Sequence, residues 1–312
     1  MGGGGGVFGG NYTPEKYKEI IRQSRESTQD AQFETTVNEK INERLGGYSR
    51  DSDTTREHLD EIKDIIVEDT IGTVEMRFGG SVSKHTYVDG LSDVDVLVII
   101  DKSELSESSP QEVLKYIKKK LIDANSENIE DITVGKSAVT VKFSGGEEIQ
   151  LLPAIRRGEG YRISAEKGDN WSNIIRPDKF AGKLTEVNQN CNGKVVPVVK
   201  LVKGIISQLP EDQQLTGYHI ESIAIEVFKS YPDSNTKTPK AMLSYFFEKA
   251  KDVVKSPIED KSNQSIHVDD SLGPRNSQER MRASYTLDRI ARRMKNADEV
   301  GSVEEWESIL GE

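Results

Sequence analysis

The stretch from Phe78 to Ile100 reads "FGGSVSKHTYVDGLSDVDVLVII" and ends in a run of β-branched and aliphatic residues. Such a run is typical of a buried strand, yet it begins with Asp93 and Asp95. Alternate side chains of a strand share a face, so the two carboxylates are expected to point the same way. They repel each other, and burying them is costly unless a cation neutralises them. The pair therefore predicts a site for Mg²⁺, which prefers carboxylate oxygens and also binds phosphates.

A glycine-rich turn, Gly79-Gly80-Ser81, lies about a dozen residues before the aspartates and follows the predicted strand 71–78. Glycines leave backbone N–H groups unobstructed, and the Ser81 hydroxyl is a further phosphate donor at the start of a short predicted helix. Taken alone, this turn is a common one, and an aspartate pair is also found as solubilising edge charge. Together, in this order, they indicate metal-dependent phosphoryl chemistry.

The composition narrows the class of protein. A chain of 312 residues with 34% hydrophobic and 30% charged residues suits a polar globular protein, and the net charge of −11 argues against a broad cationic face for long duplexes. Cys191 is the single cysteine, which excludes an intramolecular disulfide and disfavours a cysteine-ligated metal. Without a signal-like start or a membrane-length apolar run, a cytoplasmic location is expected.

The pattern along the chain predicts an α+β protein in two lobes with a cleft between them. Residues 1–12 are expected to be a disordered glycine-rich leader, 13–176 an α/β lobe with N-terminal helices and a mixed sheet, and 177–312 a helical lobe. Thr13 is a plausible N-cap. Helices are predicted at 13–45, 54–69, 109–121, 177–190, 194–208, 216–230, 237–252, 277–296 and 303–310, and further strands at 93–100, 137–143 and 147–155.

Four segments in this order resemble a known family. "GGSVSKHTYVDGLSDVDVLV" is similar to the GS…DxD signature of the DNA polymerase β-like nucleotidyltransferases. "EEIQLLPAI", "VVKLVKGI" and "TGYHIESIAIEVF" resemble the third-acid strand, the lysine-bearing helix and the tyrosine-containing helix of bacterial cGAS/DncV-like nucleotidyltransferases, the oligonucleotide cyclases of CBASS antiphage systems. The resemblance covers roughly residues 55–295 and implies a polymerase β-like lobe followed by a helical lobe.

The resemblance also implies roles for individual residues near the turn. Gly80 and Ser81 would contact the phosphates of the donor nucleotide. Asp93 and Asp95 would be the catalytic residues that bind two Mg²⁺ or Mn²⁺ ions. His85 borders the expected cleft, where it is either an ordinary loop histidine or a residue that positions an acceptor.

Further roles fall on the helical lobe. Lys200 and Lys203 are three residues apart and so share a helix face. Lys203 is more similar to the phosphate-binding lysine of the family, although both can equally be solvated helix charges. Tyr218 would stack on a base, although a helical tyrosine is more often part of the core. Glu221 would then be structural.

The sequence departs from the family pattern at the third metal-binding carboxylate, where Gln150 stands. An amide oxygen can coordinate a metal but brings no charge to help deprotonate an acceptor hydroxyl. Glu148 shares a strand face with Gln150 and is a possible substitute, although it lies one pleat, roughly 6–7 Å, away. The metal on the acceptor side is therefore the least determined part of the predicted mechanism.

The expected function is template-independent nucleotidyl transfer. Nucleoside triphosphates, ATP among them, would be joined into a short cyclic or linear oligonucleotide with release of pyrophosphate, as a signal in antiphage defence. The expected partners are the triphosphates and an effector protein that responds to the product, with no membrane and no long nucleic acid. The alternatives are transfer to a protein, RNA or small-molecule acceptor, and a nucleotide-binding regulator without turnover, which Gln150 suggests.

Overall fold

The computed structural model describes residues 14–48, 52–68, 70–89, 91–165, 169–262 and 265–312. The predicted leader 1–12 and the predicted N-cap Thr13 lie outside these residues. The helices are α1 (Pro14–Gly46), α2 (Ser52–Val67), α3 (Gly80–Ser83), α4 (Pro110–Ala124), α5 (Pro177–Asn190), α6 (Val195–Ser207), α7 (Gly217–Phe228), α8 (Pro239–Val253), α9 (Gln278–Val300) and α10 (Val303–Leu310). The strands are β1 (Gly72–Phe78), β2 (Val94–Ser103), β3 (Ile129–Val134), β4 (Val139–Phe143), β5 (Glu148–Arg157) and β6 (Gly160–Ile163).

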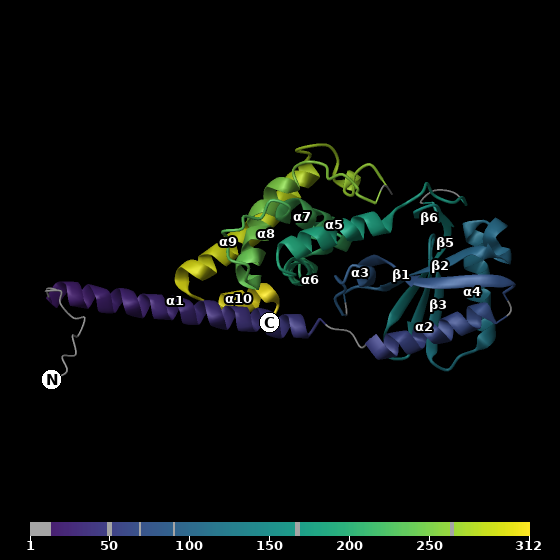
Figure 1. The fold of residues 1–312 in the computed structure, drawn as a ribbon, viewed down its shortest axis with the longest axis horizontal. Helices are drawn as coiled ribbons and strands as arrows, with labels where there is room; N and C mark the ends of the chain where they lie inside the picture. Colours follow the sequence, from purple (N-terminus) through teal and green to yellow (C-terminus); the bar gives the residue numbers. More distant parts are fainter. Residues whose placement is uncertain (1–13, 49–51, 69, 90, 166–168, 263–264) are drawn as a thin grey trace, which may run out of the picture.

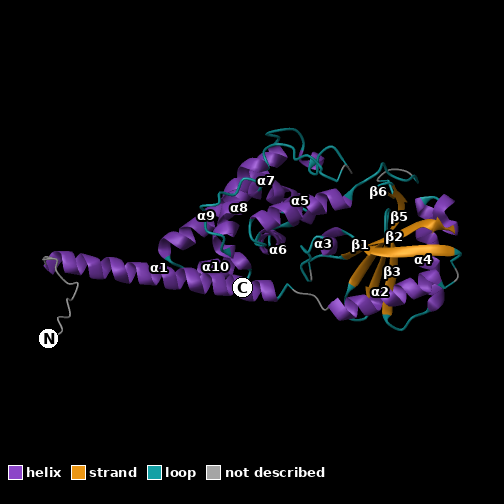
Figure 2. Ribbon diagram, viewed as in Figure 1, coloured by secondary structure: helices purple, strands orange, loops and turns teal. Residues whose placement is uncertain are grey.

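The strands form one mixed sheet in the order β1-β2-β5-β4-β3, with β6 also paired to β5. β2 and β5 run parallel at its centre, whereas the other pairs are antiparallel. The predicted mixed sheet is thus confirmed, with β3 and β6 as additional short strands. Figure 1 and Figure 2 show this sheet and its helices at one end of the molecule and the helical lobe beside them.

The alternation along β2 divides its side chains between the two faces of the sheet. Val94, Val96 and Val98 are buried in a core that also contains residues of α2 and α4. Asp95 and Leu97 point to the other face, where Leu97 joins a small apolar cluster. That second face turns towards the helical lobe, since Asp95 and Leu97 line one cavity together with side chains of α5, α6 and α7.

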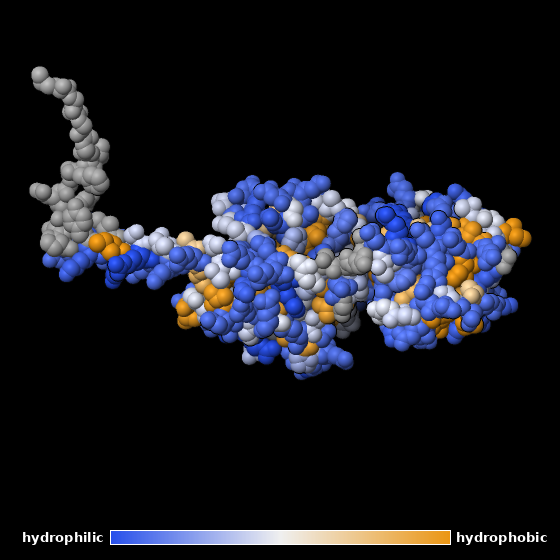
Figure 3. Space-filling view, turned by 90° about the horizontal axis from the view of Figure 1, so that it is seen from below, coloured by the Kyte–Doolittle hydropathy of each residue, from blue (hydrophilic) through white to orange (hydrophobic). Residues whose placement is uncertain are grey.

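α1 packs on the helical lobe and not on the α/β lobe with which the sequence grouped it. Its Val37 and Ile41 are fully buried in the helical core, and Glu34 pairs with Lys240 of α8. The boundary at residue 176 stays a prediction, but the core to which α1 contributes belongs to the C-terminal helices. The outer part of α1 projects from the body, and Figure 3 shows it covered largely by hydrophilic side chains.

The capping residues explain where several helices begin. Ser109 caps α4 with a reciprocal capping box and Pro110 at the first turn, and Thr216 accepts a hydrogen bond from the backbone N–H of His219 at the start of α7. Thr238 caps α8 in the same way. Among the described helices, none combines the length and the apolar character that a bilayer span requires.

Candidate active site

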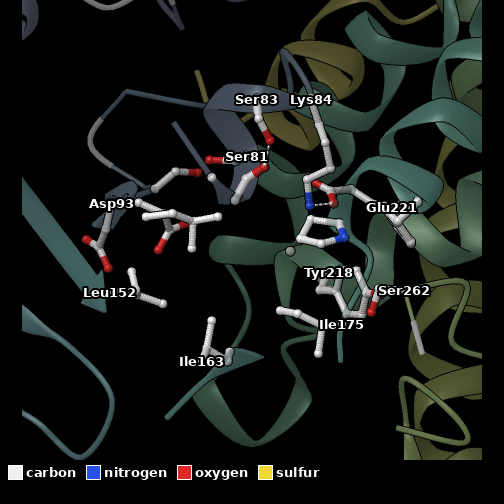
Figure 4. Close-up of a pocket in the computed structure, with 18 of the residues that line it drawn as sticks. Ser81, Ser83, Lys84, Asp93, Leu152, Ile163, Ile175, Tyr218, Glu221 and Ser262 are labelled. Atoms are coloured by element: carbon white, nitrogen blue, oxygen red, sulfur yellow. Dashed lines mark hydrogen bonds and ion pairs between the residues drawn. The ribbon is translucent and has the colours of Figure 1, made fainter. Parts of the chain in front are cut away.

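A cavity of about 450 Å³ lies between the lobes, at the point where α3 and β2 meet α5, α6 and α7. Figure 4 shows Ser81, Ser83 and Lys84 on one side and Leu152, Ile163 and Ile175 on the opposite side. Asp93 and Asp95 line the same cavity. One cavity therefore offers carboxylates, ammonium groups and an apolar wall, the combination that a phosphorylated ligand with an aromatic ring requires.

The glycine turn is in direct contact with Asp95, the second aspartate of the pair. The backbone N–H of Gly79 donates to the carbonyl of Asp95 at 2.8 Å. Gly80 has a φ of +46°, and a Cβ on it would lie 1.6 Å from Oδ2 of Asp95. Only glycine meets both conditions without strain. The second glycine of the motif is therefore explained by the carboxylate that lies against it.

The two aspartates share the cavity but differ in exposure. Asp93 is exposed just before β2, whereas Asp95 is partly buried. Burial, followed by the charge of Asp93, raises the pKa of Asp95 from 3.8 to about 6. The ionised pair is thus unfavourable by itself and favours a cation. Carboxylate oxygens are the donors that Mg²⁺ prefers, so Asp93 and Asp95 fit a magnesium ion.

Gln150 lies beside this pair. It is in parallel register with Asp95, and its Nε2 donates to Oδ2 of Asp93 at 2.6 Å. Glu148 is exposed at the start of β5, opposite Lys142 of β4, and is not among the described residues that line the cavity. Within the described ranges, no three His, Cys, Asp or Glu residues form a group able to hold a metal. Of the two candidates for a third ligand, the structure thus places Gln150 next to Asp93, with its amide nitrogen towards the carboxylate. Gln150, like Glu148, is not among the described residues that line the cavity.

Two lysines share one buried carboxylate in the wall of the cavity. Lys203 of α6 and Lys84, at the end of α3, both pair with Glu221 of α7, and Thr86 donates to the same carboxylate. Burial alone would raise the pKa of Glu221, but the two ammonium groups outweigh it and hold that pKa below its ordinary value. Glu221 is thus an ionised partner for both lysines.

Lys200 and Lys203, which the sequence predicted as a pair, differ in their position relative to the cavity. Lys203 lines the cavity, whereas Lys200 is not among the described lining residues. Lys84 was missed from the sequence, although it follows the glycine turn by one helical turn in "GGSVSK". His85, at a φ of +59°, is exposed and also outside that set of lining residues.

Tyr218 forms another wall, with its ring 4.6 Å from that of Phe180. Its hydroxyl donates to Oδ1 of Asp260 at 2.6 Å, and Asp260 also accepts from the backbone N–H and the hydroxyl of Ser262 at 2.7 Å each. Burial, together with the hydrogen bond to Asp260, raises the pKa of Tyr218. Asp260 and Ser262 lie between the helices predicted at 237–252 and 277–296, where the sequence analysis named no site residue, so their part in the site was not visible in the sequence.

Comparisons with known proteins identify the fold. Neither the models of protein families nor the curated proteins give a match to this chain. Among solved structures, Escherichia coli CdnC with ATP has a TM-score of 0.63 at 17% identity and covers 88% of this chain and 98% of its own. Vibrio cholerae DncV, a cyclic AMP-GMP synthase in complex with a linear intermediate, has a TM-score of 0.62 at 10% identity, with 96% and 91% covered. Rhodothermus marinus CdnE, a c-UMP-AMP synthase, has 0.59 at 18% identity, with 80% and 94% covered.

These similarities confirm the predicted fold. The chain has the architecture of the cGAS/DncV-like nucleotidyltransferases, a polymerase β-like α/β lobe followed by a helical lobe. At identities below 20%, the likeness concerns the backbone, and the roles of individual residues have to be argued from the site itself.

Proposed function

We propose that the protein is a template-independent, metal-dependent nucleotidyltransferase that joins nucleoside triphosphates into a short cyclic or linear oligonucleotide. The observation that carries this proposal is the contact between the Gly79-Gly80-Ser81 turn and Asp95 in a cavity that also contains two lysines. The fold neighbours include a cyclic AMP-GMP synthase and a c-UMP-AMP synthase, which supports the same reaction class.

Different walls of the cavity would bind different parts of the proposed substrate. Gly80 and Ser81 would seat the phosphates of the donor nucleotide, whereas the half-buried ring of Tyr218, backed by the buried ring of Phe180, would offer flat apolar surface to a base. Asp93 and Asp95 would hold magnesium, which, when bound, neutralises charge on the phosphates and activates the attacking hydroxyl.

In the proposed reaction, a hydroxyl oxygen of one nucleotide forms a bond to the α-phosphorus of another. The bond from that phosphorus to the bridging oxygen breaks, pyrophosphate leaves, and the hydroxyl proton passes to solvent. The chain contributes mainly by orientation, because a well-oriented pair of reactants reacts far faster than a free pair in solution.

We further propose that the product is a signal in antiphage defence and that an effector protein responds to it. One of the structural neighbours, E. coli CdnC, is known in a complex with a HORMA protein, so protein partners occur with this fold.

The test is pyrophosphate release by the purified protein with Mg²⁺ or Mn²⁺ and all ribo- and deoxyribonucleoside triphosphates. The double variant Asp93→Ala, Asp95→Ala should release none above background, and Asp233→Ala, at a fully exposed carboxylate, should match the wild type. If the wild type releases no more than the double variant, the proposal is wrong. Mass spectrometry of the product then identifies its bases, its linkage and its length.

Gln150 favours one alternative, a nucleotide-binding regulator without turnover. Its amide donates to Asp93 and supplies no third negative charge. Tight metal-dependent binding of a triphosphate without pyrophosphate release would support this alternative. If the labelled nucleotide instead remains on a protein, an RNA or a small molecule, the activity is transfer to that acceptor.

A further inference from the structure

Lys203, the lysine that the sequence favours for phosphate binding, has its hydrogen-bonding capacity taken up by the protein. An ammonium group has three donors. Nζ of Lys203 lies 2.9 Å from the carbonyl oxygen of Thr86, 2.9 Å from Oε1 of Glu221 and 3.3 Å from Oγ1 of Thr86. Its side chain is 8% exposed. A phosphate would have to displace one of these buried contacts to bind Lys203 directly.

Lys84 differs in this respect. Its ammonium group donates to Oε2 of Glu221, the acceptor that the described part of the chain provides for it, so two of its three donors are left for a ligand. It lines the cavity, and Nζ lies 5.0 Å from the centre of the Phe180 ring and 5.2 Å from that of Tyr218. The rings and the carboxylate fix the ammonium group in place without using up its donors.

The charges of this cluster also favour an anion. Lys84 and Lys203 bring two positive charges, and Glu221 offsets one of them. All three side chains are removed from water, with exposed fractions of 11%, 8% and 1%. An unbalanced buried charge is costly, and an anionic ligand next to it lowers that cost. Once a divalent ion neutralises Asp93 and Asp95, the walls of the cavity carry a net positive charge.

We propose that Lys84 donates directly to the β- or γ-phosphate of the bound triphosphate, and that Lys203 is a positioning residue that holds Glu221 and Thr86. This inference rests on the proposed function, because it assigns a residue of the same cavity to the same substrate. It transfers the direct phosphate contact from α6 to the residue that follows α3, next to Ser81.

Isothermal titration calorimetry with ATP, AMP and inorganic tripolyphosphate tests the assignment. Lys84→Met should weaken the binding of ATP and tripolyphosphate about tenfold, the equivalent of about 1.4 kcal/mol, and change AMP binding less than about twofold. Lys84→Arg should keep most of the affinity for tripolyphosphate, since it restores the charge. The matched control is Lys229→Met, because Lys229 pairs with Glu226 of α7 at an exposed position and should leave all three affinities unchanged.

The role of Lys203 has its own readout. Lys203→Met should lower the melting temperature more than Lys84→Met, because Lys203 holds three buried contacts. At a temperature where both variants are folded, it should lose less tripolyphosphate affinity than Lys84→Met. The opposite order of affinities would overturn the assignment.

The remaining outcomes separate this inference from the proposed function. If wild-type protein binds neither ATP nor tripolyphosphate, the proposed function itself fails. If the wild type binds both and Lys84→Met binds them equally well, only the role of Lys84 is wrong. An equal loss for AMP and ATP would also overturn it, because Lys84 would then contact the part that the two ligands share.

Discussion

Replacing Gly80 by alanine should abolish activity through the position of Asp95. The backbone at Gly80 has a φ of +46°, and the added Cβ would lie 1.6 Å from Oδ2 of Asp95. The left-handed conformation costs an alanine about 1 kcal/mol. Real Cβ contacts are 3.4 Å or longer in ordinary packing, so the turn or the carboxylate has to move by roughly 2 Å. Misplacement of a reacting group by about 1 Å can cost about 100-fold in rate, so a loss of at least this size is expected.

Gly158→Ala is the matched control, since it separates the backbone cost from the clash. Gly158 has a φ of +56° in the turn between β5 and β6, and an added Cβ would meet nothing within 4 Å. Both variants should lose about 1 kcal/mol of unfolding free energy from the backbone, measured by urea denaturation. Only Gly80→Ala should lose pyrophosphate release. Equal rates for the two variants would refute the argument that Gly80 exists to accommodate Asp95.

Three further predictions test the charges and buried contacts. In the metal-free protein, Asp95→Asn should raise the melting temperature at pH 7.5 but not at pH 4. The pKa of Asp95 is about 6 in the folded protein and 3.8 ordinarily, so its carboxylate costs the fold stability as the pH rises between these values. Equal melting temperatures of the variant and the wild type at pH 7.5 would contradict this. Arg280→Met should cost about 3–5 kcal/mol of unfolding free energy in urea, since it leaves Asp269 buried without its cation, whereas the exposed Arg292→Met should cost less than about 0.5 kcal/mol. Gln150→Asp should strengthen Mn²⁺ binding roughly tenfold in calorimetric titrations, and an unchanged affinity would exclude position 150 from the metal site.

The elements that the sequence predicted well are those with local signals. β2 was visible from its aliphatic run, and α5 begins at Pro177 and ends at Asn190 as predicted. Proline in the first turn and the threonine caps Thr216 and Thr238 are recognisable because they act within three or four residues. The strands β3 and β6 were missed although each forms a hairpin with the strand next to it in the chain. β3 buries little of its length and β6 has only four residues, so neither carries a clear apolar alternation.

The parts of the site that could not be predicted depend on long-range contacts. Lys84 meets Glu221 across 137 positions of sequence, and Tyr218 meets Asp260 across 42. No local pattern distinguishes such a lysine from a solvated one. The sequence also did not predict that α1 packs on the helical lobe. Its few buried residues, such as Ile41, stand among many charged residues and give no clear apolar stripe.

The ion pairs of Lys84 and Lys203 with Glu221 join the two lobes. The proposed binding of phosphate by Lys84 therefore depends on how the lobes are arranged. Lys84 and Thr86 follow α3 in the α/β lobe, whereas Lys203 and Glu221 belong to helices of the other lobe. A second link joins Arg77 of β1 to Asp178 of α5 by two hydrogen bonds, at 3.1 and 2.6 Å. A shift of one lobe against the other would therefore draw Lys84 away from Glu221 and expose a buried carboxylate, which is costly. The contacts that fix the lobes thus also hold Lys84 near the Gly79-Gly80-Ser81 turn, so the proposed phosphate subsite would be assembled only when the two lobes are in register.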